Sequence, residues 1–289
     1  ARYGTPGGDA PEFPWFRHLQ EIGPGFWNVR APLRVLGVDV GTHMSLARLR
    51  DGGIVAIDTV SLTEQPGLRE EIDALTEGGR RLTAVLGTHP FHTLSFPGFH
   101  EAYPGGPGRQ YYAAPRLLRL YPEIPWAGNI TDVLGRWPDL GMLLPEGGDF
   151  VAPEPADRNH LMNVFVLHRP SRTVHNDDTI MVVPPTGPGA GPVAGRGWAW
   201  PLLSLLLESF RPGMHFHPSL WSEGLRRTGE APGQFEASME RLLAWDFENL
   251  CSAHVGNSLG DARGQVRQLL EDSRQRLREL AAKYARGNG

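Results

Sequence analysis

The sequence predicts a mixed α/β fold, and three observations carry that prediction. Residues 33–60 hold apolar runs of strand character separated by the turn residues Asp51-Gly52-Gly53, which predicts an antiparallel meander. Residues 66–79 are rich in helix formers and lead into a short apolar run at 82–86. A helix that precedes a buried strand is typical of α/β domains. A second strand-rich half follows, and it ends in a long charged helix.

The second half begins with a predicted hairpin. Residues 163–167 and 172–175 are its strands, and residues 168–171 are its turn. Further elements are expected as short strands at 111–114, 126–130 and 249–253, and as helices at about 200–210, 219–227, 233–245 and 261–286. The last helix alternates charge and leucine, which predicts a solvated face over an apolar stripe rather than a nucleic-acid role.

The chain is expected to have three parts. Residues 1–32, rich in glycine, proline and aromatic residues, are predicted to form an arm packed on the domain. Residues 33–260 are predicted to form the domain itself, and residues 261–289 a C-terminal helix packed on it. The Gly/Pro-rich stretch 184–197 is predicted to be a flexible loop suited to a lid.

The composition narrows the classes of function. A chain of 289 residues with a formal net charge of -4 has no general attraction for nucleic acid or for a membrane surface, so a small-molecule substrate is the expected partner. Cys251 is the only cysteine, so any metal must be held mainly by His and carboxylates. The longest apolar stretch, residues 198–207, is too short to span a bilayer, and no signal peptide is evident. We therefore expect a cytoplasmic protein, whose oligomeric state the sequence leaves open.

His and Asp residues accompany several of the predicted strands. The series is Thr88-His89-Pro90-Phe91-His92, then Asn159-His160, then Asn176-Asp177-Asp178, then His254. Neutral imidazole nitrogens and carboxylate oxygens brought together from several strand ends are usual ligands of Zn, Fe or Mn. The series therefore predicts a metal site.

This order and its strand context resemble the metallo-β-lactamase superfamily over about residues 33–260. The resemblance implies a four-layer αββα sandwich whose metal ligands lie on loops at one edge of the sheets. Members carry an H-x-H-x-D-H motif, a later His, a bridging Asp after a hairpin, and a final His. Carried over by position, the resemblance implies a ligand set of His89, His92, His160, Asp178 and His254, with Asp177 as the competing carboxylate.

The first motif departs from the superfamily pattern. His89 and His92 are followed by Thr93 and Leu94, and the Asp and the adjacent His of the full motif are missing. That Asp binds the second metal in dinuclear members, so the departure predicts a mononuclear centre. A divergent, uncharacterised branch with a His-x-x-His-like motif followed by Tyr-Pro fits residues 92–104 better.

The predicted function is a metal-dependent hydrolase acting on a small-molecule ester, lactone, amide or phosphoester. A bound ion lowers the pKa of its water from about 15.7 to about 7, so a metal-bound water would be the nucleophile. Zn is the expected ion, with Fe or Mn as alternatives, and Asp177 is the candidate base if Asp178 binds the metal. The same ligands would suit Fe-dependent oxygen chemistry. A further alternative is a non-catalytic binding or scaffold protein with degraded ligands.

The remaining histidines are assigned by context. His18, His43, His100 and His168 are predicted to be structural, with His168 at a hairpin turn away from the metal edge. The pair His215 and His217 would share one face on a strand, or would lie in a turn before a helix. These two are a reserve set of ligands or substrate contacts.

A competing signal lies at residues 37–45. Gly37-Val38-Asp39-Val40-Gly41-Thr42 resembles the first phosphate loop of actin-like and Hsp70-like ATPases. That family would also require a second phosphate loop and an adenosine motif, which the sequence does not offer in a convincing strand context. An ATPase is therefore the weaker alternative, and Asp39 is interpreted as a turn residue. Cys251 is predicted to be a buried apolar residue rather than a nucleophile.

Overall fold

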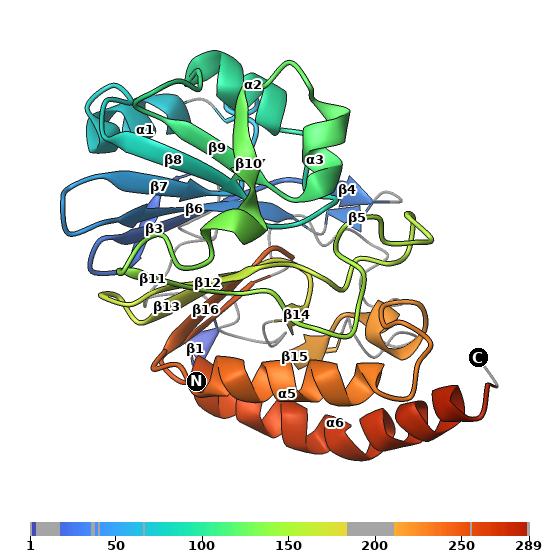
Figure 1. Cartoon of the computed structure of the whole chain (residues 1–289). Helices are drawn as coiled ribbons and strands as arrows, with labels where there is room; N and C mark the ends of the chain where they lie inside the picture. The colour runs from blue at the N-terminus through green and yellow to red at the C-terminus, as the bar shows by residue number, and fades with distance from the viewer. Residues whose placement is uncertain are drawn as a thin grey trace.

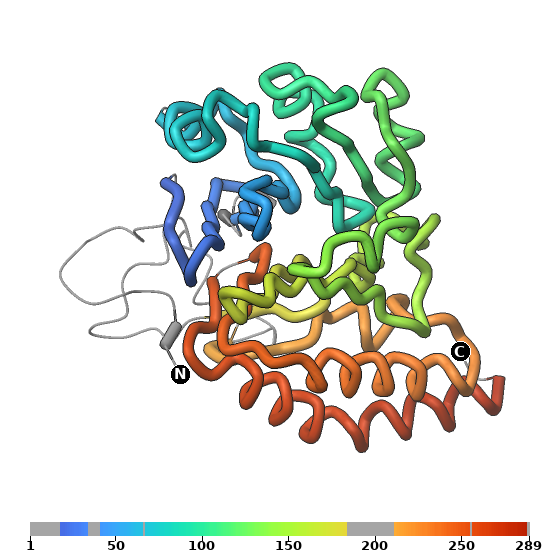
Figure 2. The backbone as a smooth tube through the Cα atoms, turned by 60° about the vertical axis from the view of Figure 1, so that its left-hand side comes forward, coloured from blue at the N-terminus to red at the C-terminus, as the bar shows by residue number. Residues whose placement is uncertain are grey.

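The structure is a computed structural model that describes residues 2–3, 18–35, 38–39, 41–65, 67–183, 211–254 and 256–287. Two β-sheets lie face to face, and helices cover the outer face of each (Figure 1). The same layers are visible after rotation by 60° in Figure 2. The predicted αββα sandwich is therefore confirmed. The predicted loop at 184–197 and helix at 200–210 lie outside the described residues.

The first sheet has the order β10-β9-β8-β7-β6-β3-β2. Its strands are β2 (Gln20–Gly23), β3 (Phe26–Ala31), β6 (Thr42–Arg48), β7 (Ile54–Ile57), β8 (Leu82–Gly87), β9 (Gln110–Ala113) and β10 (Trp126–Asn129). The strands β7, β8, β9 and β10 run parallel, whereas β3, β6 and β7 pair antiparallel. The outer face carries α1 (Leu68–Thr76), α2 (Phe96–Ala102) and α3 (Pro115–Leu120), at the top of Figure 1. The short 3-10 helix η1 (Ile130–Val133) follows β10.

The second sheet has the order β1-β17-β16-β13-β12-β11. Its strands are β1 (Arg2–Tyr3), β11 (Leu140–Leu143), β12 (Phe165–His168), β13 (Thr173–Asn176), β16 (Asn249–Ser252) and β17 (Asn257–Leu259). The strands β13 and β16 are parallel. The helices α5 (Ala231–Leu243) and α6 (Ala262–Ala285) pack together below this sheet in Figure 1. Two strand pairs stand apart: β4 (Arg34–Val35) with β5 (Val38–Asp39), and β14 (Ile180–Val183) with β15 (Gly213–Phe216).

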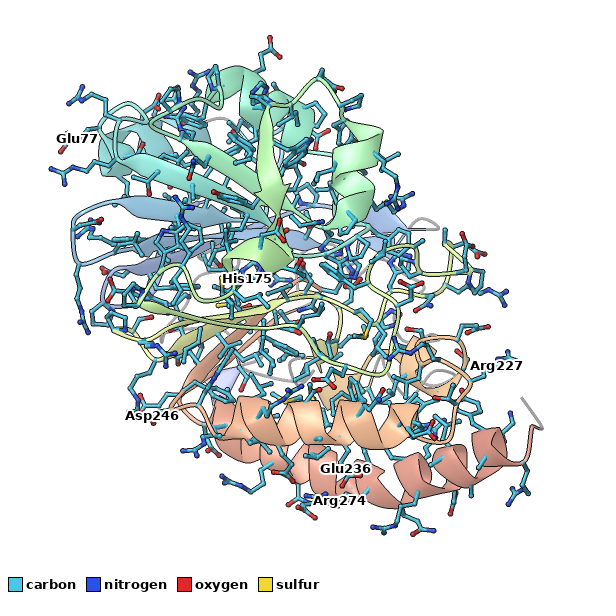
Figure 3. All side chains as sticks on the ribbon, in the orientation of Figure 1. Glu77, His175, Arg227, Glu236, Asp246 and Arg274 are labelled. Atoms are coloured by element: carbon cyan, nitrogen blue, oxygen red, sulfur yellow. The ribbon has the colours of Figure 1, made fainter. Side chains whose placement is uncertain are left out.

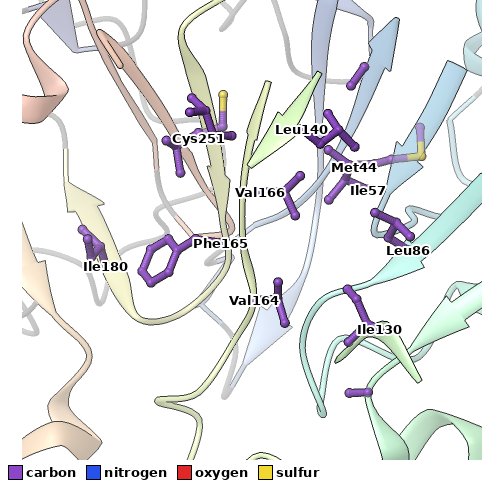
Figure 4. Packing of buried hydrophobic residues seen from close by; sticks show 14 of the residues in the cluster. Met44, Ile57, Leu86, Ile130, Leu140, Val164, Phe165, Val166, Ile180 and Cys251 are labelled. Carbon is purple, nitrogen blue, oxygen red and sulfur yellow. The ribbon is translucent and has the colours of Figure 1, made fainter. Parts of the chain in front are cut away.

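The core lies between the two sheets. Figure 4 shows Met44, Ile57 and Leu86 of the first sheet facing Leu140 and Val166 of the second. Every residue of β7 is buried, because one of its faces meets the second sheet and the other meets helices. Each fully buried aliphatic side chain of this kind contributes about 2 kcal/mol through the hydrophobic effect.

Several predicted elements differ from the observed ones. The strands β2 and β3 lie within the predicted arm, and β3 pairs with β6 over six residue positions, so the sheet begins before residue 33. A turn at Gly25, with a φ of 75°, joins the two strands, and only a residue that tolerates the left-handed region fits there. The helix predicted at 219–227 is instead a short 3-10 helix, η3 (Pro218–Trp221). No helix among the described residues is long and apolar enough to cross a membrane.

His168 ties the two sheets together. Its Nε2–H donates to the backbone oxygen of Arg48, 2.9 Å away, at the end of β6. Its Nδ1 lies 2.8 Å from the hydroxyl of Ser171, and its ring stacks on Phe26. These contacts place His168 at the hairpin turn, as expected. Burial lowers the pKa of His168.

This burial predicts a pH dependence of stability. Below about pH 6.5 the unfolded chain binds a proton at residue 168 that the folded chain resists, so the folded state loses free energy as the pH falls. His168→Gln keeps an N–H donor but cannot titrate. The free energy of unfolding of the wild type relative to H168Q should therefore decline from about pH 7.5 to about pH 5.5. Urea denaturation of both proteins at each pH measures this difference, and a constant difference would contradict the assignment.

Candidate metal centre

The predicted His and Asp series meets at one edge of the sandwich because its members follow strands that run in the same direction. The parallel strands β7 and β8 end beside each other, which places Asp58 next to Thr88 and His89. The parallel strands β13 and β16 likewise bring Asp177 and Asp178 to the same edge as His254. Two groups of three side chains bring possible ligand atoms within 4.8 Å of one another: His89, His92 and Asp178, and His43, His175 and Asp177.

Asp178 lies at the centre of the first group. Its Oδ2 is 3.4 Å from His89 Nε2, 3.4 Å from His92 Nε2 and 3.5 Å from His160 Nδ1. Its Oδ1 is 2.9 Å from His254 Nε2. The side chain is 1 % exposed, and neither carboxylate oxygen has a hydrogen-bond partner among the described residues. A buried carboxylate ringed by four imidazoles without a hydrogen bond of good geometry is arranged as metal ligands are.

His254 and His160 each use one ring nitrogen in a hydrogen bond to a backbone carbonyl, and the other nitrogen of each ring faces Asp178. His254 Nδ1 lies 2.6 Å from the carbonyl oxygen of Gly41, which can only accept, so in the neutral ring Nδ1 carries the proton and Nε2 is bare. His160 Nε2 lies 3.2 Å from the carbonyl oxygen of Ala156, which leaves its Nδ1 bare in the same way. A second nitrogen that donates to a backbone carbonyl is the usual support of a metal-binding histidine.

His89 has a different pattern. Its Nδ1 accepts the backbone N–H of Phe91 at 3.0 Å, so the proton of the neutral ring is on Nε2. That Nε2 lies 3.0 Å from the carbonyl oxygen of His160, and the ring is fully buried. Burial lowers the pKa of His89 to about 3, so the ring is neutral. Both nitrogens of His89 are thus already used within the protein.

His92 stands between the two aspartates. Its Nδ1 lies 3.0 Å from Asp177 Oδ1, and its Nε2 faces Asp178. Burial alone would lower the pKa of His92, but the two carboxylates outweigh it and hold the pKa well above its usual value. Burial would likewise raise the pKa of Asp178, and above all the charge of His92 instead holds it well below its usual value.

The second group lies deeper, between the sheets. Asp177 Oδ1 is 3.4 Å from His43 Nε2 and 3.8 Å from His175 Nε2, and all three side chains are fully buried. His43, from β6, stacks on His175, from β13, with ring centroids 4.1 Å apart. Figure 3 labels His175 in the space between the two sheets. We call Asp58, Thr88 and these three residues the inner cluster.

Most polar atoms of the inner cluster are hydrogen-bonded, and the exceptions are His43 Nε2 and Asp177 Oδ1, which have no hydrogen-bond partner among the described residues. His175 Nε2 donates to Asp58 Oδ2 at 2.9 Å, and His43 Nδ1 lies 3.1 Å from the amide nitrogen of Asn28. That amide nitrogen also donates to the carbonyl oxygen of Met44, which fixes its orientation, so His43 Nδ1 accepts and His43 Nε2 carries the proton. Both rings of the inner cluster therefore turn an N–H, not a bare nitrogen, toward a carboxylate.

Thr88 joins the carboxylates of Asp58 and Asp177. Its hydroxyl oxygen lies 2.6 Å from Asp58 Oδ2 and 2.6 Å from Asp177 Oδ2, and its backbone N–H donates to Asp58 Oδ1. One hydroxyl carries one hydrogen, so the second short contact needs a proton from a carboxyl group. Burial, and then the charge of Asp177, raise the pKa of Asp58 to about 6. Asp58 also holds a left-handed backbone with a φ of 55°, which is uncommon outside glycine.

The reserve pair separates in the structure. His215 is on β15, and its Nε2 lies 2.9 Å from the carbonyl oxygen of Arg211, so it has a local partner. His217 caps η3 and lies beside the centre, with its ring centroid 6.1 Å from that of His160. Burial lowers the pKa of His217 to about 4, and Asp178 only partly offsets this.

The sequence prediction missed the inner cluster. His43 was expected to be structural, and His175, Ser45 and Asn28 were not singled out; the structure places all four around Asp177 or its partners. The sequence did carry a signal for this cluster, because side chains alternate between the two faces of a strand. His43 and Ser45 therefore share one face of β6, and Thr173 and His175 share one face of β13. Polar residues on the inward face of otherwise buried strands need partners inside the core.

Two other sequence patterns do not form sites. Gly256-Asn257-Ser258-Leu259-Gly260 has the spacing of a serine nucleophile turn, but Ser258 is fully buried within β17 and its hydroxyl has no hydrogen-bond partner among the described residues. In the stretch 37–45, the described residues form β5 and the start of β6, and His43 belongs to the inner cluster. Neither placement supports an ATPase or a serine hydrolase.

Solved structures share this fold. A metallo-β-lactamase of Pseudomonas aeruginosa in its mono-zinc form has a TM-score of 0.51 and 12% identity, covering 88% of this chain and 95% of its own. A metallo-β-lactamase of Pontibacter korlensis has a TM-score of 0.51 and 12% identity, covering 88% and 99%. A metal-soaked flavodiiron core from Synechocystis has a TM-score of 0.53 and 13% identity, covering 90% and 60%.

The chain thus has the metallo-β-lactamase fold, at identities that show the fold alone. No protein-family model and no curated protein matches the sequence. Zinc and flavodiiron proteins both occur among the structural neighbours, so the fold by itself is compatible with either metal.

The inner cluster predicts the effect of removing one hydroxyl. Thr88→Val leaves two buried carboxylates without their shared donor, which should lower the free energy of unfolding by about 1.5 to 3 kcal/mol. Thr83→Val is the matched control, because Thr83 lies on β8, the strand that Thr88 follows, and its hydroxyl donates to the backbone carbonyl of Ile54. Its cost should stay near about 1 kcal/mol. Equal losses in chemical denaturation would contradict a special role for Thr88.

Proposed function

We propose that the protein is a metal-dependent hydrolase that holds one divalent ion with His92, His160, His254 and Asp178. The observation that carries the proposal is Asp178, a buried carboxylate with four imidazoles within 3.5 Å and no hydrogen bond to either oxygen among the described residues. Ligand atoms at about 2.0 to 2.1 Å from a tetrahedral zinc lie about 3.3 Å apart. The distances around Asp178 Oδ2 are close to that value.

Each proposed ligand has support from its neighbours. His160 and His254 donate their other N–H to backbone carbonyls. His92 turns its other nitrogen to Asp177, so Asp177 would orient His92 as a supporting carboxylate. Asp177 is fully buried and contacts Thr88, which favours this orienting role over that of a base for a solvent-derived nucleophile.

His89 would act beside the ligands rather than among them. Its Nε2–H holds the carbonyl of His160, and that contact fixes the loop that delivers the His160 ring. Coordination through Nε2 would require His89 to give up this contact and the Phe91 N–H.

The ion, when bound, would take up a water molecule as a fifth ligand, lower the pKa of that water and polarise the scissile bond. The substrate class that fits is a small-molecule ester, lactone, amide or phosphoester, and zinc is the ion that we propose. The proposal includes a cytoplasmic location, as the sequence predicts.

A second candidate is iron-dependent oxygen chemistry. The likeness to the flavodiiron core supports it, and imidazole with carboxylate suits iron as well as zinc. Metal analysis after purification from cells supplied with both metals separates the two. Zinc retained with ester or phosphoester hydrolysis supports the first function, and iron with oxygen consumption supports the second.

The ligand set predicts metal content. Wild-type protein should hold about one ion per chain, whereas Asp178→Asn and His254→Ala should each hold less than about 0.2, because each removes one of four ligands. His18→Ala is the control, because His18 is exposed and contacts only Glu71 among the described residues. Plasma mass spectrometry of dialysed protein gives the ratio. Wild-type protein that stays below about 0.2 ions after Zn, Fe or Mn is added would refute the proposal.

A second metal measurement separates the two groups of histidines. His43→Asn should keep about one ion per chain, because the inner cluster is held by hydrogen bonds, whereas His160→Ala should lose the ion. His89→Gln should weaken zinc affinity by about 10-fold to 100-fold without abolishing binding, as removal of a supporting residue does. Competition with a chromophoric chelator measures these affinities. A folded H43N protein without metal would place the ion in the inner cluster.

A further inference from the structure

His217 is an imidazole with one nitrogen occupied and the other free. Its Nδ1 accepts the backbone N–H of Ser219 at 3.2 Å, and the Ser219 hydroxyl lies 2.7 Å from the same atom. A backbone N–H can only donate, so the neutral ring carries its proton on Nε2. The Nε2 atom has no hydrogen-bond partner among the described residues. It is also not among the fully buried polar atoms that lack a partner, so it keeps some exposure to solvent.

The backbone holds this ring beside the candidate metal centre. His217 directly follows β15, which pairs with β14, the strand that begins two residues after Asp178. The backbone N–H of His217 donates to the carbonyl oxygen of Thr179 at 3.1 Å, next to Asp178 in the chain. The ring lies nearly parallel to that of His160, with centroids 6.1 Å apart and 20° between planes.

The cap alone does not require a histidine. An acceptor for the Ser219 N–H is all that the first turn of η3 needs, and Ser, Thr, Asp or Asn usually supplies it. Besides this acceptor, the imidazole of His217 carries an N–H donor at the opposite side of the ring. With Nδ1 committed to the cap, His217 can offer an N–H donor but not a bare nitrogen, so it is unsuited to ligate the ion.

We propose that His217 is a substrate-binding residue whose Nε2–H donates to an oxygen of the substrate at the rim of the metal centre. This rests on the proposed function, and it narrows the substrate to molecules with an acceptor oxygen next to the reacting bond, such as a carbonyl or phosphoryl group. A fixed, neutral donor of this kind stabilises negative charge that develops on such an oxygen.

The test uses two variants of the zinc-loaded protein and inorganic phosphate as the probe. His217→Asn keeps an acceptor for the Ser219 N–H but has no N–H at the position of Nε2. His217→Gln carries an amide N–H that reaches toward that position. Calorimetric titration gives the phosphate affinity, and zinc content and melting temperature are measured on the same samples.

H217N should bind phosphate about tenfold more weakly or worse, as loss of a hydrogen bond to a charged group predicts. Its zinc content should equal that of the wild type, and H217Q should recover part of the affinity. Wild-type affinity in H217N would overturn the proposal, as would zinc-loaded wild type that binds phosphate no better than metal-free protein. A wild type that binds no metal would instead refute the proposed function, so the two failures are distinguishable.

Discussion

The burial of three carboxylates, Asp58, Asp177 and Asp178, in one region between the sheets constrains the rest of this structure. A buried charge costs several kcal/mol unless it is paired. Every ion pair that these carboxylates form with described residues is with an imidazole. A neutral imidazole can donate one hydrogen bond to a carboxylate, but it cancels the negative charge only when it is protonated or binds a cation. The centre must therefore hold protons or a metal ion, and metal binding would release protons held by groups such as His92.

Histidines serve in this region both as proposed metal ligands and as hydrogen-bonded support, because the backbone around them differs. His160 and His254 lie outside regular strands, and the backbone carbonyls of Ala156 and Gly41 accept their second N–H. His43 and His175 lie within strands whose carbonyls are already paired, so their protons turn to side chains instead. Strand interiors thus give a hydrogen-bonded support, and strand ends give nitrogens free to coordinate.

The sequence predicted that the residues at these strand ends would lie close together, because a polar residue after an apolar run is visible in one dimension. It predicted the sandwich through the order of those residues along the chain. The inner cluster was not predictable in this way, because alternation shows that His43 and Ser45 share a face without showing which strand of the other sheet faces them. The extent of the first sheet was misjudged for a related reason. The glycines and aromatic residues of 18–31 suggested an arm, but pairing with β6 decides that segment.

The proposal of a single ion rests on the residues that stand where the superfamily motif has its Asp and second His. The superfamily pattern would have an Asp and a His where this chain has Thr93 and Leu94. Thr93 is buried with no acidic oxygen to offer, and the Leu94 side chain is 77% exposed, so neither supplies a ligand. On the far side of Asp178 only His254 remains among the described residues, and a carboxylate oxygen with one imidazole is too few ligands for a second ion. In the proposed centre, His254 therefore belongs to the ligands of the single ion. Its Nε2 also lies nearer to Asp178 than any other imidazole nitrogen does, which supports this assignment.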